Sequence, residues 1–179
     1  MNKLIDYIRS DIKARGKKQT FGAFMKLYFT ERTFRYTFWL RLRQFTCKNK
    51  LLGGVFRAIV RIKSNHLQIY VGTNDIGKGL HIVHAGNIRL NANKIGQNFK
   101  VYHGVTIGSD ANNGVPVIGD NVTCYTNSVI CGSIVIGDGC KIGATAFVNH
   151  SLEPYCTVIN QCLIKEKKDN LENFQNNAS

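Results

Sequence analysis

A period of six residues runs through the chain from Ile76 to Val148 and restricts its fold more than any other feature. Aliphatic residues recur at this interval, with Cys124 as the one substitute. The interval is broken only by one extra residue before Ile95 and by five before Ile118. The anchors of the period are Ile76, Ile82, Ile88, Ile95, Val101, Ile107, Ile118, Cys124, Ile130, Ile136, Ile142 and Val148.

Each six-residue unit also carries the residues of a tight turn. Gly, Asn and Asp follow the anchors, as in IGKG, IGDN and IGDG, and they adopt turn conformations that other residues resist. A second inward candidate follows most anchors by four positions, for example Leu80, Phe99 and Val105. Because a unit of one short strand and one turn cannot bury its own apolar face, such units must stack on copies of themselves. The sequence therefore predicts a mainly β fold made of stacked repeats.

This pattern resembles that of the hexapeptide-repeat proteins. The resemblance implies a left-handed parallel β-helix in which three hexapeptides form one triangular coil. The left hand is a property of that family and departs from the usual right-handed crossover between parallel strands. On this basis we expect four coils, which begin at Ile76, Ile95, Ile118 and Ile136.

The positive charge of the chain is confined to its first third. Residues 1–65 hold 16 Lys and Arg against 3 Asp and Glu, whereas residues 66–179 hold 8 of each, so the first segment carries the whole formal net charge of +13. Such an asymmetry marks a boundary between segments. We therefore expect a basic helical segment over 1–65, a β-helix domain over 66–160 and a polar C-terminal tail over 161–179.

Aromatic residues in the basic segment have helical spacing. In TFRYTFWLRLRQF the apolar residues recur at intervals of three and four, as on one face of a helix, and LLGGVFRAIVRI repeats the pattern. Two or three small α-helices therefore precede the repeats. In one interpretation the aromatic face packs on the rest of the protein while Arg35, Arg41 and Arg43 face water. The apolar face of the first helix consists of Phe34, Phe38, Leu42 and Phe45.

In the other interpretation the basic segment binds an anionic partner. A basic, aromatic-rich helix suits peripheral contact with an anionic membrane surface or with a lipid-linked glycan. No known nucleic-acid-binding motif accompanies the charge, so we do not expect nucleic acid as a partner. The chain has no uncharged apolar run of 18 residues, and its start, MNKLIDYIRSDIK, lacks the apolar core of a signal peptide. These features predict a cytoplasmic protein, at most peripheral at the inner face of the membrane.

Two histidines occupy the same place in successive coils. His84 lies two residues after Ile82, and His103 lies two residues after Val101. Parallel strands lie about 4.8 Å apart, so the two rings should be direct neighbours at one corner. The inserted segment SDANNGVPV leaves the repeats soon after His103. We therefore take this corner as the candidate site and treat His66, His81 and His150 as structural.

The stretch GKGLHIVHAGNIRLN, followed by KVYHGVTIGSDANNGVPVIGDNV, resembles the serine acetyltransferase type of acetyl-CoA-dependent O-acetyltransferase. The resemblance covers roughly residues 69–160. It implies acetyl-CoA as the acyl donor and a homotrimer whose sites are shared between chains. By the same resemblance His84 is the catalytic base, and the positions that line the pantetheine groove are Gly108, Ser109, Thr126 and Ala144. An alcohol is a poor nucleophile at neutral pH, and an imidazole with a pKa of about 6.5 can accept its proton.

The chain also departs from that family where serine would be bound. The family's D-I-H-P segment reads VGTN here, so this stretch around Gly72 has no aspartate to pair with the base. Val83 replaces a substrate-binding aspartate, and SDANNGVP lacks the family's Arg-His pair. A zwitterion needs charged partners in a dry site, whereas a sugar hydroxyl does not. We therefore expect a sugar acceptor. The combination of this core with a short basic N-terminal segment resembles the O-acetyltransferases of capsule or lipopolysaccharide assembly, which implies a role in surface polysaccharide biosynthesis. The alternative is serine O-acetylation in cysteine biosynthesis.

Other residues are assigned to the acceptor side of the site. Asn74 and Asp75 are candidates to accept a hydrogen bond from the second ring nitrogen of His84, and Asn87 is a weaker candidate. His103 either hydrogen-bonds the acceptor or protonates the leaving thiolate. The family's G-V-P-A-K/R coenzyme loop reads INQCLIK here, so the contacts to the adenine end of the coenzyme differ.

Two functions of other classes are weighed against this one. A zinc enzyme on the same β-helix, like the gamma carbonic anhydrases, uses an H-x4-H spacing, whereas this chain has H-x2-H at His81 and His84. No C-x-x-C pair is present either, so we expect no metal and free thiols. The second rival is a non-catalytic scaffold in which the repeats only form a surface.

Overall fold

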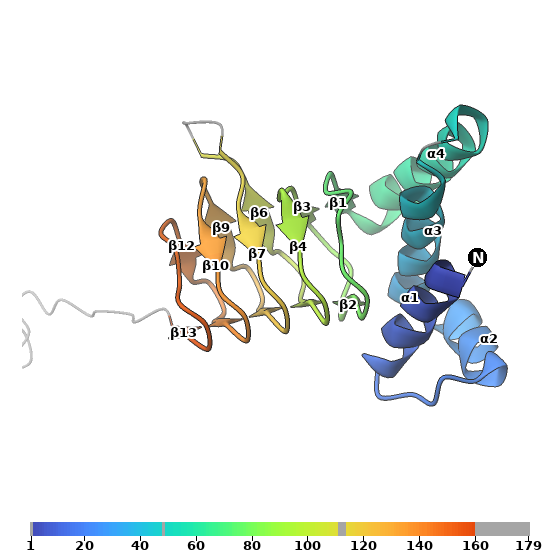
Figure 1. Ribbon diagram of the computed structural model, residues 1–179, viewed down its shortest axis with the longest axis horizontal. Coiled ribbons are helices and arrows are strands. Elements are labelled where there is room, and N and C mark those ends of the chain that lie inside the picture. The colour runs from blue at the N-terminus through green and yellow to red at the C-terminus, as the bar shows by residue number, and fades with distance from the viewer. Residues whose placement is uncertain (1, 48, 111–113, 160–179) are drawn as a thin grey trace, which may run out of the picture.

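The computed structural model describes residues 2–47, 49–110 and 114–159. Four helices form a body at one end, and a column of short strands extends away from it (Figure 1). The helices are α1 (Asn2–Lys13), α2 (Phe21–Thr30), α3 (Arg32–Thr46) and α4 (Lys50–Leu67). Helix α3 packs against each of the other three helices and contacts the first coil of the column.

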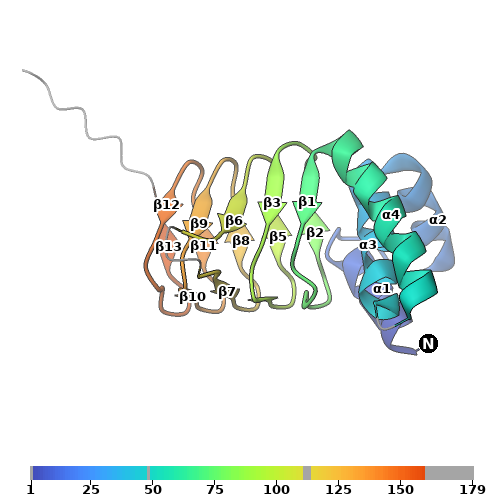
Figure 2. The same ribbon diagram turned by 90° about the horizontal axis from the view of Figure 1, so that it is seen from above.

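The strands form the three faces of a left-handed parallel β-helix of about five turns (Figure 2). The first face consists of β1 (Ile69–Val71), β3 (Ile88–Leu90), β6 (Thr106–Gly108), β9 (Val129–Cys131) and β12 (Phe147–Val148). The second face consists of β4 (Lys94–Ile95), β7 (Val117–Ile118) and β10 (Val135–Ile136). The third face consists of β2 (His81–Ile82), β5 (Lys100–Val101), β8 (Thr123–Cys124), β11 (Lys141–Ile142) and β13 (Thr157–Val158). The predicted β-helix with preceding helices is therefore confirmed.

The number of coils and one anchor were predicted wrongly. The expected stack of Ile76, Ile95, Ile118 and Ile136 does form on the second face. However, β1 precedes this stack, and Leu152 pairs with Ile136 beyond it, so there are about five turns rather than four.

The wrong anchor is Ile88, because Leu90 and not Ile88 pairs with Ile107. The corner after Ile82 is therefore two residues longer than the corner after Val101. Ile88 pairs instead with Ile69 of β1 and also points into the core.

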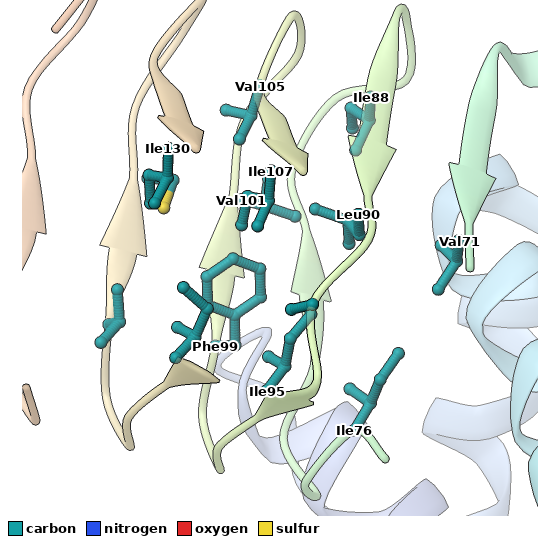
Figure 3. Packing of buried hydrophobic residues seen from close by; sticks show 14 of the residues in the cluster. Val71, Ile76, Ile88, Leu90, Ile95, Phe99, Val101, Val105, Ile107 and Ile130 are labelled. Carbon is teal, nitrogen blue, oxygen red and sulfur yellow. The ribbon is translucent and has the colours of Figure 1, made fainter. Parts of the chain in front are cut away.

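The core is a column of aliphatic side chains that point inward from all three faces (Figure 3). Ile82, Ile95 and Leu90 each retain no exposed surface. Burial of such a side chain contributes about 1.5–3 kcal/mol, so the repeated core supplies most of the stability of the coils. The turns between faces need special backbone: Gly104 has a φ of 73°, and a Cβ there would clash with the side chain of Asn127.

Side chains of the helical body complete the free edge of the first coil. This coil has no preceding coil to pair with, so its outward carbonyl groups require other donors. Arg41 donates to the carbonyl oxygens of Ile76 at 2.9 Å and of Gly77 at 2.7 Å. The further donor and acceptor pairs are Tyr36 to Ile69, Arg43 to Val71 and Thr73, Gln44 to Ile76, and Arg15 to Leu80.

Arg41 is held by a buried ion pair with Asp11. Its Nε and second terminal nitrogen donate to the two carboxylate oxygens of Asp11, each at 2.9 Å, and Arg41 is fully buried. Asp11 Oδ1 also accepts from the backbone N–H of Leu80 at 2.7 Å. The expectation that Arg41 faces water is therefore wrong. The free carbonyl groups of the first coil outweigh the usual preference of arginine for the surface.

Loss of this ion pair should destabilise the whole chain. We expect Arg41→Met to lower the free energy of unfolding by about 3–5 kcal/mol, because it leaves the Asp11 carboxylate buried without its partner. Urea unfolding at pH 7 measures the change. The control is Asp6→Asn, which breaks the ion pair between Asp6 and Lys78, whose side chains are 57% and 41% exposed, respectively. This substitution should lower the free energy of unfolding by less than about 1 kcal/mol. Equal losses in the two variants would contradict the role of the buried pair.

Candidate active site

The structure brings His84 and His103 together at the corner between the third and first faces. Each follows a strand of the third face, and the pairing of Ile82 with Val101 aligns the two corners. The imidazole centroids lie 6.0 Å apart with an angle of 59° between the planes. Both side chains are exposed. The rings are therefore neighbours, but they are tilted rather than stacked face to face.

The longer first corner shapes this site. It carries Gly86 with a φ of 121° and Asn87 with a φ of 47°, and the carbonyl of Gly86 accepts from the N–H of Gly104 at 2.8 Å. Asn87 is exposed at the same corner as His84. Within the described residues, no group donates or accepts a hydrogen bond at the His84 imidazole.

Two tyrosines beside the histidines were not identified from the sequence. The ring of Tyr102 makes an edge contact with His84 at 6.1 Å and stacks on Tyr125 at 5.3 Å. The amine of Lys100 lies 5.5 Å from the centre of the Tyr102 ring. Each tyrosine directly follows a buried anchor, Val101 or Cys124. This shared position in the repeat could have predicted from the sequence that the two rings are neighbours.

The predicted coenzyme residues fall into two groups. Thr126 and Ala144 lie in register with His103, because Cys124 pairs with both Val101 and Ile142. His84, His103, Thr126 and Ala144 therefore form one row along a single corner, which we call the histidine edge. Gly108 ends β6 and Ser109 follows it, so these two residues lie at the opposite end of the first face. A Cβ on Gly108 would meet no atom within 4 Å, so this position borders open space.

Asn74 and Asp75 do not lie beside His84. Both occupy the corner between the first and second faces, whereas His84 occupies the corner between the third and first. Asn74 borders a cleft with Arg43 and Arg57, and Asp75 borders a different cleft beside α1. Their assignment as partners of His84 within one chain is therefore corrected. Gly72 precedes the same corner and approaches the side chain of Asn91 instead.

His81 lies on β2 and is half-buried beneath the end of α1. Burial, together with the positive charges of Arg15 and Lys100, lowers its pKa to about 4. Its Nδ1 is buried and has no hydrogen-bond partner among the described residues. His81 is therefore neutral near pH 7, and it borders a groove between α1 and the third face.

Over residues 2–47, 49–110 and 114–159, no group of three His, Cys, Asp or Glu side chains is arranged to hold a metal ion. The described cysteines are free thiols, with Cys124 and Cys140 buried and Cys47 exposed. The predicted polar tail and Cys162 lie outside the described residues.

Sequence comparisons relate the chain to serine acetyltransferases. It is 32% identical to the serine acetyltransferase of Buchnera aphidicola over 108 residues, which cover 56% of this chain and 41% of the relative. It is 36% identical to that of Staphylococcus epidermidis over 97 residues, which cover 52% of this chain and 45% of the relative. The chain thus spans about half the length of the curated relatives it matches. No protein-family model matches it.

Solved structures share the fold. The chain superposes on soybean serine acetyltransferase complexed with serine with a TM-score of 0.75 and 22% identity, covering 90% of this chain and 69% of the other. It superposes on the Brucella abortus enzyme in complex with coenzyme A with a TM-score of 0.68 and 23% identity, covering 87% and 64%. At these identities the likeness establishes the architecture, a helical body followed by a β-helix.

Proposed function

We propose that this protein transfers an acetyl group from acetyl-CoA to a hydroxyl group at the histidine edge. The observation that carries the proposal is the pair of exposed imidazoles, His84 and His103, 6.0 Å apart on a β-helix similar to the serine acetyltransferases. An exposed imidazole can remove a proton from a bound hydroxyl at neutral pH. The scaffold hypothesis gives no reason for two such rings to meet.

In the proposed mechanism His84 is the general base. Its free ring nitrogen takes the proton of the acceptor hydroxyl while the hydroxyl oxygen attacks the thioester carbonyl carbon. The tetrahedral intermediate carries a negative oxygen that backbone N–H groups stabilise. Collapse of this intermediate breaks the carbon–sulfur bond, and the leaving thiolate takes a proton from His103 or from protonated His84. The products are the acetyl ester and coenzyme A.

The donor is proposed to lie along the histidine edge. Thr126 and Ala144 continue the row beyond His103, and Gly108 and Ser109 are retained as further contacts on the first face. A neighbour solved with coenzyme A supports this class of donor. We also propose a homotrimer, in which neighbouring chains complete each site.

The acceptor has two candidates. The names of the relatives and the serine-bound soybean structure favour serine, which was the alternative hypothesis from the sequence. The side chains at the edge favour a sugar hydroxyl. Val83 precedes His84, and the ring of Tyr102, stacked on Tyr125, contacts it, whereas a zwitterion would need charged partners. Acetyl transfer to serine and to a panel of free and phosphorylated sugars distinguishes the two.

The two histidines should differ in their effect on the rate. We expect His84→Ala to lower the rate constant of acetyl transfer by about 10² to 10⁴ and His103→Ala by about tenfold to a hundredfold. The affinity for acetyl-CoA should change little in both, because neither ring is assigned to its binding. Steady-state kinetics with the best acceptor of the panel, together with calorimetric titration of coenzyme A, measures both quantities.

The control variant is His150→Ala. His150 is exposed at a corner of the same β-helix and hydrogen-bonds only the side chain of Asn149 among the described residues. It should retain the wild-type rate. Loss of activity in His103→Ala with a normal rate in His84→Ala would reverse the assignment of the base. Normal rates in both would exclude acyl transfer at this edge.

A peripheral membrane contact is proposed through α2. Phe21, Met25 and Phe29 recur every fourth residue, so they share one face of the helix, and they are 77%, 37% and 66% exposed. Lys26 and Arg32 are exposed close to this stripe. An apolar stripe flanked by cations suits the interface of an anionic bilayer. None of the described helices is both long and apolar enough to cross a membrane.

Vesicle binding tests this contact. We expect the protein to cosediment with acidic liposomes at low salt and to dissociate as the salt rises past about 0.15 M, where the Debye length is about 8 Å. Phe21→Ser with Phe29→Ser should abolish binding. The matched control is Phe147→Ser, which removes a 61% exposed aromatic residue from β12. Equal binding to neutral and acidic liposomes would contradict the proposal.

A further inference from the structure

We propose that the groove between α1 and the third face binds the phosphate group of a phosphorylated acceptor. The inference rests on the proposed acetyl transfer and narrows its acceptor to a sugar phosphate or sugar diphosphate. The groove has a volume of about 550 Å³ and lies at the junction of the helical body and the first three coils. The polar residues that carry the argument are Lys13, Lys78, His81, Asn98, Lys100 and Asn121.

The charge of this groove is positive and largely uncompensated. Lys13 comes from the end of α1, Lys78 from the first coil and Lys100 from β5, so three separate segments contribute lysines to the lining of one groove. No acidic residue is among those that line it. Of these three lysines, only Lys78 has a salt bridge among the described residues, an exposed one to Asp6 at 3.2 Å. Lys13 and Lys100, together with Lys78 and its exposed ion pair, form a site for a multiply charged anion such as a phosphate.

Polar donors that carry no charge complete the groove. Asn98 and Asn121 lie in successive coils, and the amide of Asn98 donates to the side-chain oxygen of Asn121 at 3.0 Å. The amide of Asn121 therefore still has donors to offer an anion. His81 lines the groove beside these amides and adds no charge at pH 7, because burial and the neighbouring cations lower its pKa to about 4.

The third face, which forms one side of the groove, ends at the histidine edge. Lys100 and His103 belong to one segment, three residues apart, which corresponds to about 10 Å along a strand. Tyr102 lies between them in the chain; the Lys100 amine is 5.5 Å from its ring centre, and the centre of the His84 ring is 6.1 Å from it. A phosphate held at Lys100 therefore places the attached sugar beside Tyr102 and brings a ring hydroxyl to His84.

Coenzyme A also carries phosphates, but the position of the groove favours the acceptor. The row of Thr126 and Ala144 continues from His103 towards the last coils, whereas the groove borders the first three coils and the helical body. Donor and acceptor would thus approach the histidine edge from opposite ends. Serine carries no phosphate, so a phosphate-binding groove would not contribute to its binding.

Binding measurements on the full chain test the proposal. Calorimetric titrations use inorganic pyrophosphate, a nucleoside diphosphate sugar, and the matching methyl glycoside without phosphate. We expect the two phosphorylated probes to bind and the glycoside to bind far more weakly. Lys100→Gln should weaken both phosphorylated probes by about tenfold, because it removes one charge-assisted contact. Lys13→Gln should act in the same direction.

The matched control is Lys141→Gln. Lys141 lies on the same face in register with Lys100, because Thr123 pairs with both, and it is exposed outside the groove. Its substitution should leave all affinities unchanged. Equal effects of Lys100→Gln and Lys141→Gln would overturn the proposal. A parallel loss of coenzyme A affinity in Lys100→Gln would assign the groove to the donor and overturn it as well.

Transfer assays separate this inference from the proposed function and identify the source of the phosphate. Faster acetylation of a phosphorylated sugar than of its methyl glycoside supports the groove, and equal rates contradict it while leaving the acetyltransferase proposal intact. Absence of transfer to every acceptor, with pyrophosphate still bound through Lys100, contradicts the proposed function. Comparison of a nucleoside diphosphate sugar with a lipid diphosphate sugar in micelles then shows which carrier the groove accepts.

Discussion

The open end of a parallel β-helix is the constraint on which this structure depends. Its first coil presents carbonyl groups that no neighbouring coil can satisfy, and an unsatisfied buried carbonyl is costly. The helical body solves this with the bidentate pair of Arg41 and Asp11, which reaches both carbonyl and N–H groups of the coil. At least one cation of the N-terminal segment, Arg41, therefore stabilises the fold and is not available to bind a partner.

Once the first coil is capped, the six-residue period aligns functional side chains of successive coils in rows. Because each coil repeats the last, one position of the repeat generates a whole edge, and His84, His103, Thr126 and Ala144 share such an edge. The two additional residues after Ile82 change this regularity at one coil only, where the rings tilt by 59°. The same repetition puts Lys100 on the adjoining face, where it lines the groove beside α1 and its amine lies 5.5 Å from the centre of the Tyr102 ring.

The sequence predicts the stacking of the coils, but it does not predict the contacts between segments that are distant in the chain. The anchors from Ile95 to Val148 followed the period, whereas Ile88 was misplaced because Leu90, two residues later, is equally apolar. Asn74 and Asp75 are near His84 in sequence but a corner away in space, since a coil turns within a few residues. No local sequence pattern indicates the burial of Arg41, because an arginine in an amphipathic helix normally faces solvent. Arg41 is buried because the free edge of the first coil offers carbonyl oxygens to its guanidinium.

The central claim is that acetyl transfer occurs along the histidine edge, and amide chemical shifts on addition of coenzyme A test it most directly. The account predicts that backbone signals of His103, Thr126 and Ala144 move with saturation, whereas those of Asn74 and Asp75 at the opposite corner do not. Shifts confined to the helical body, or to the corner of Asn74 and Asp75, would contradict it.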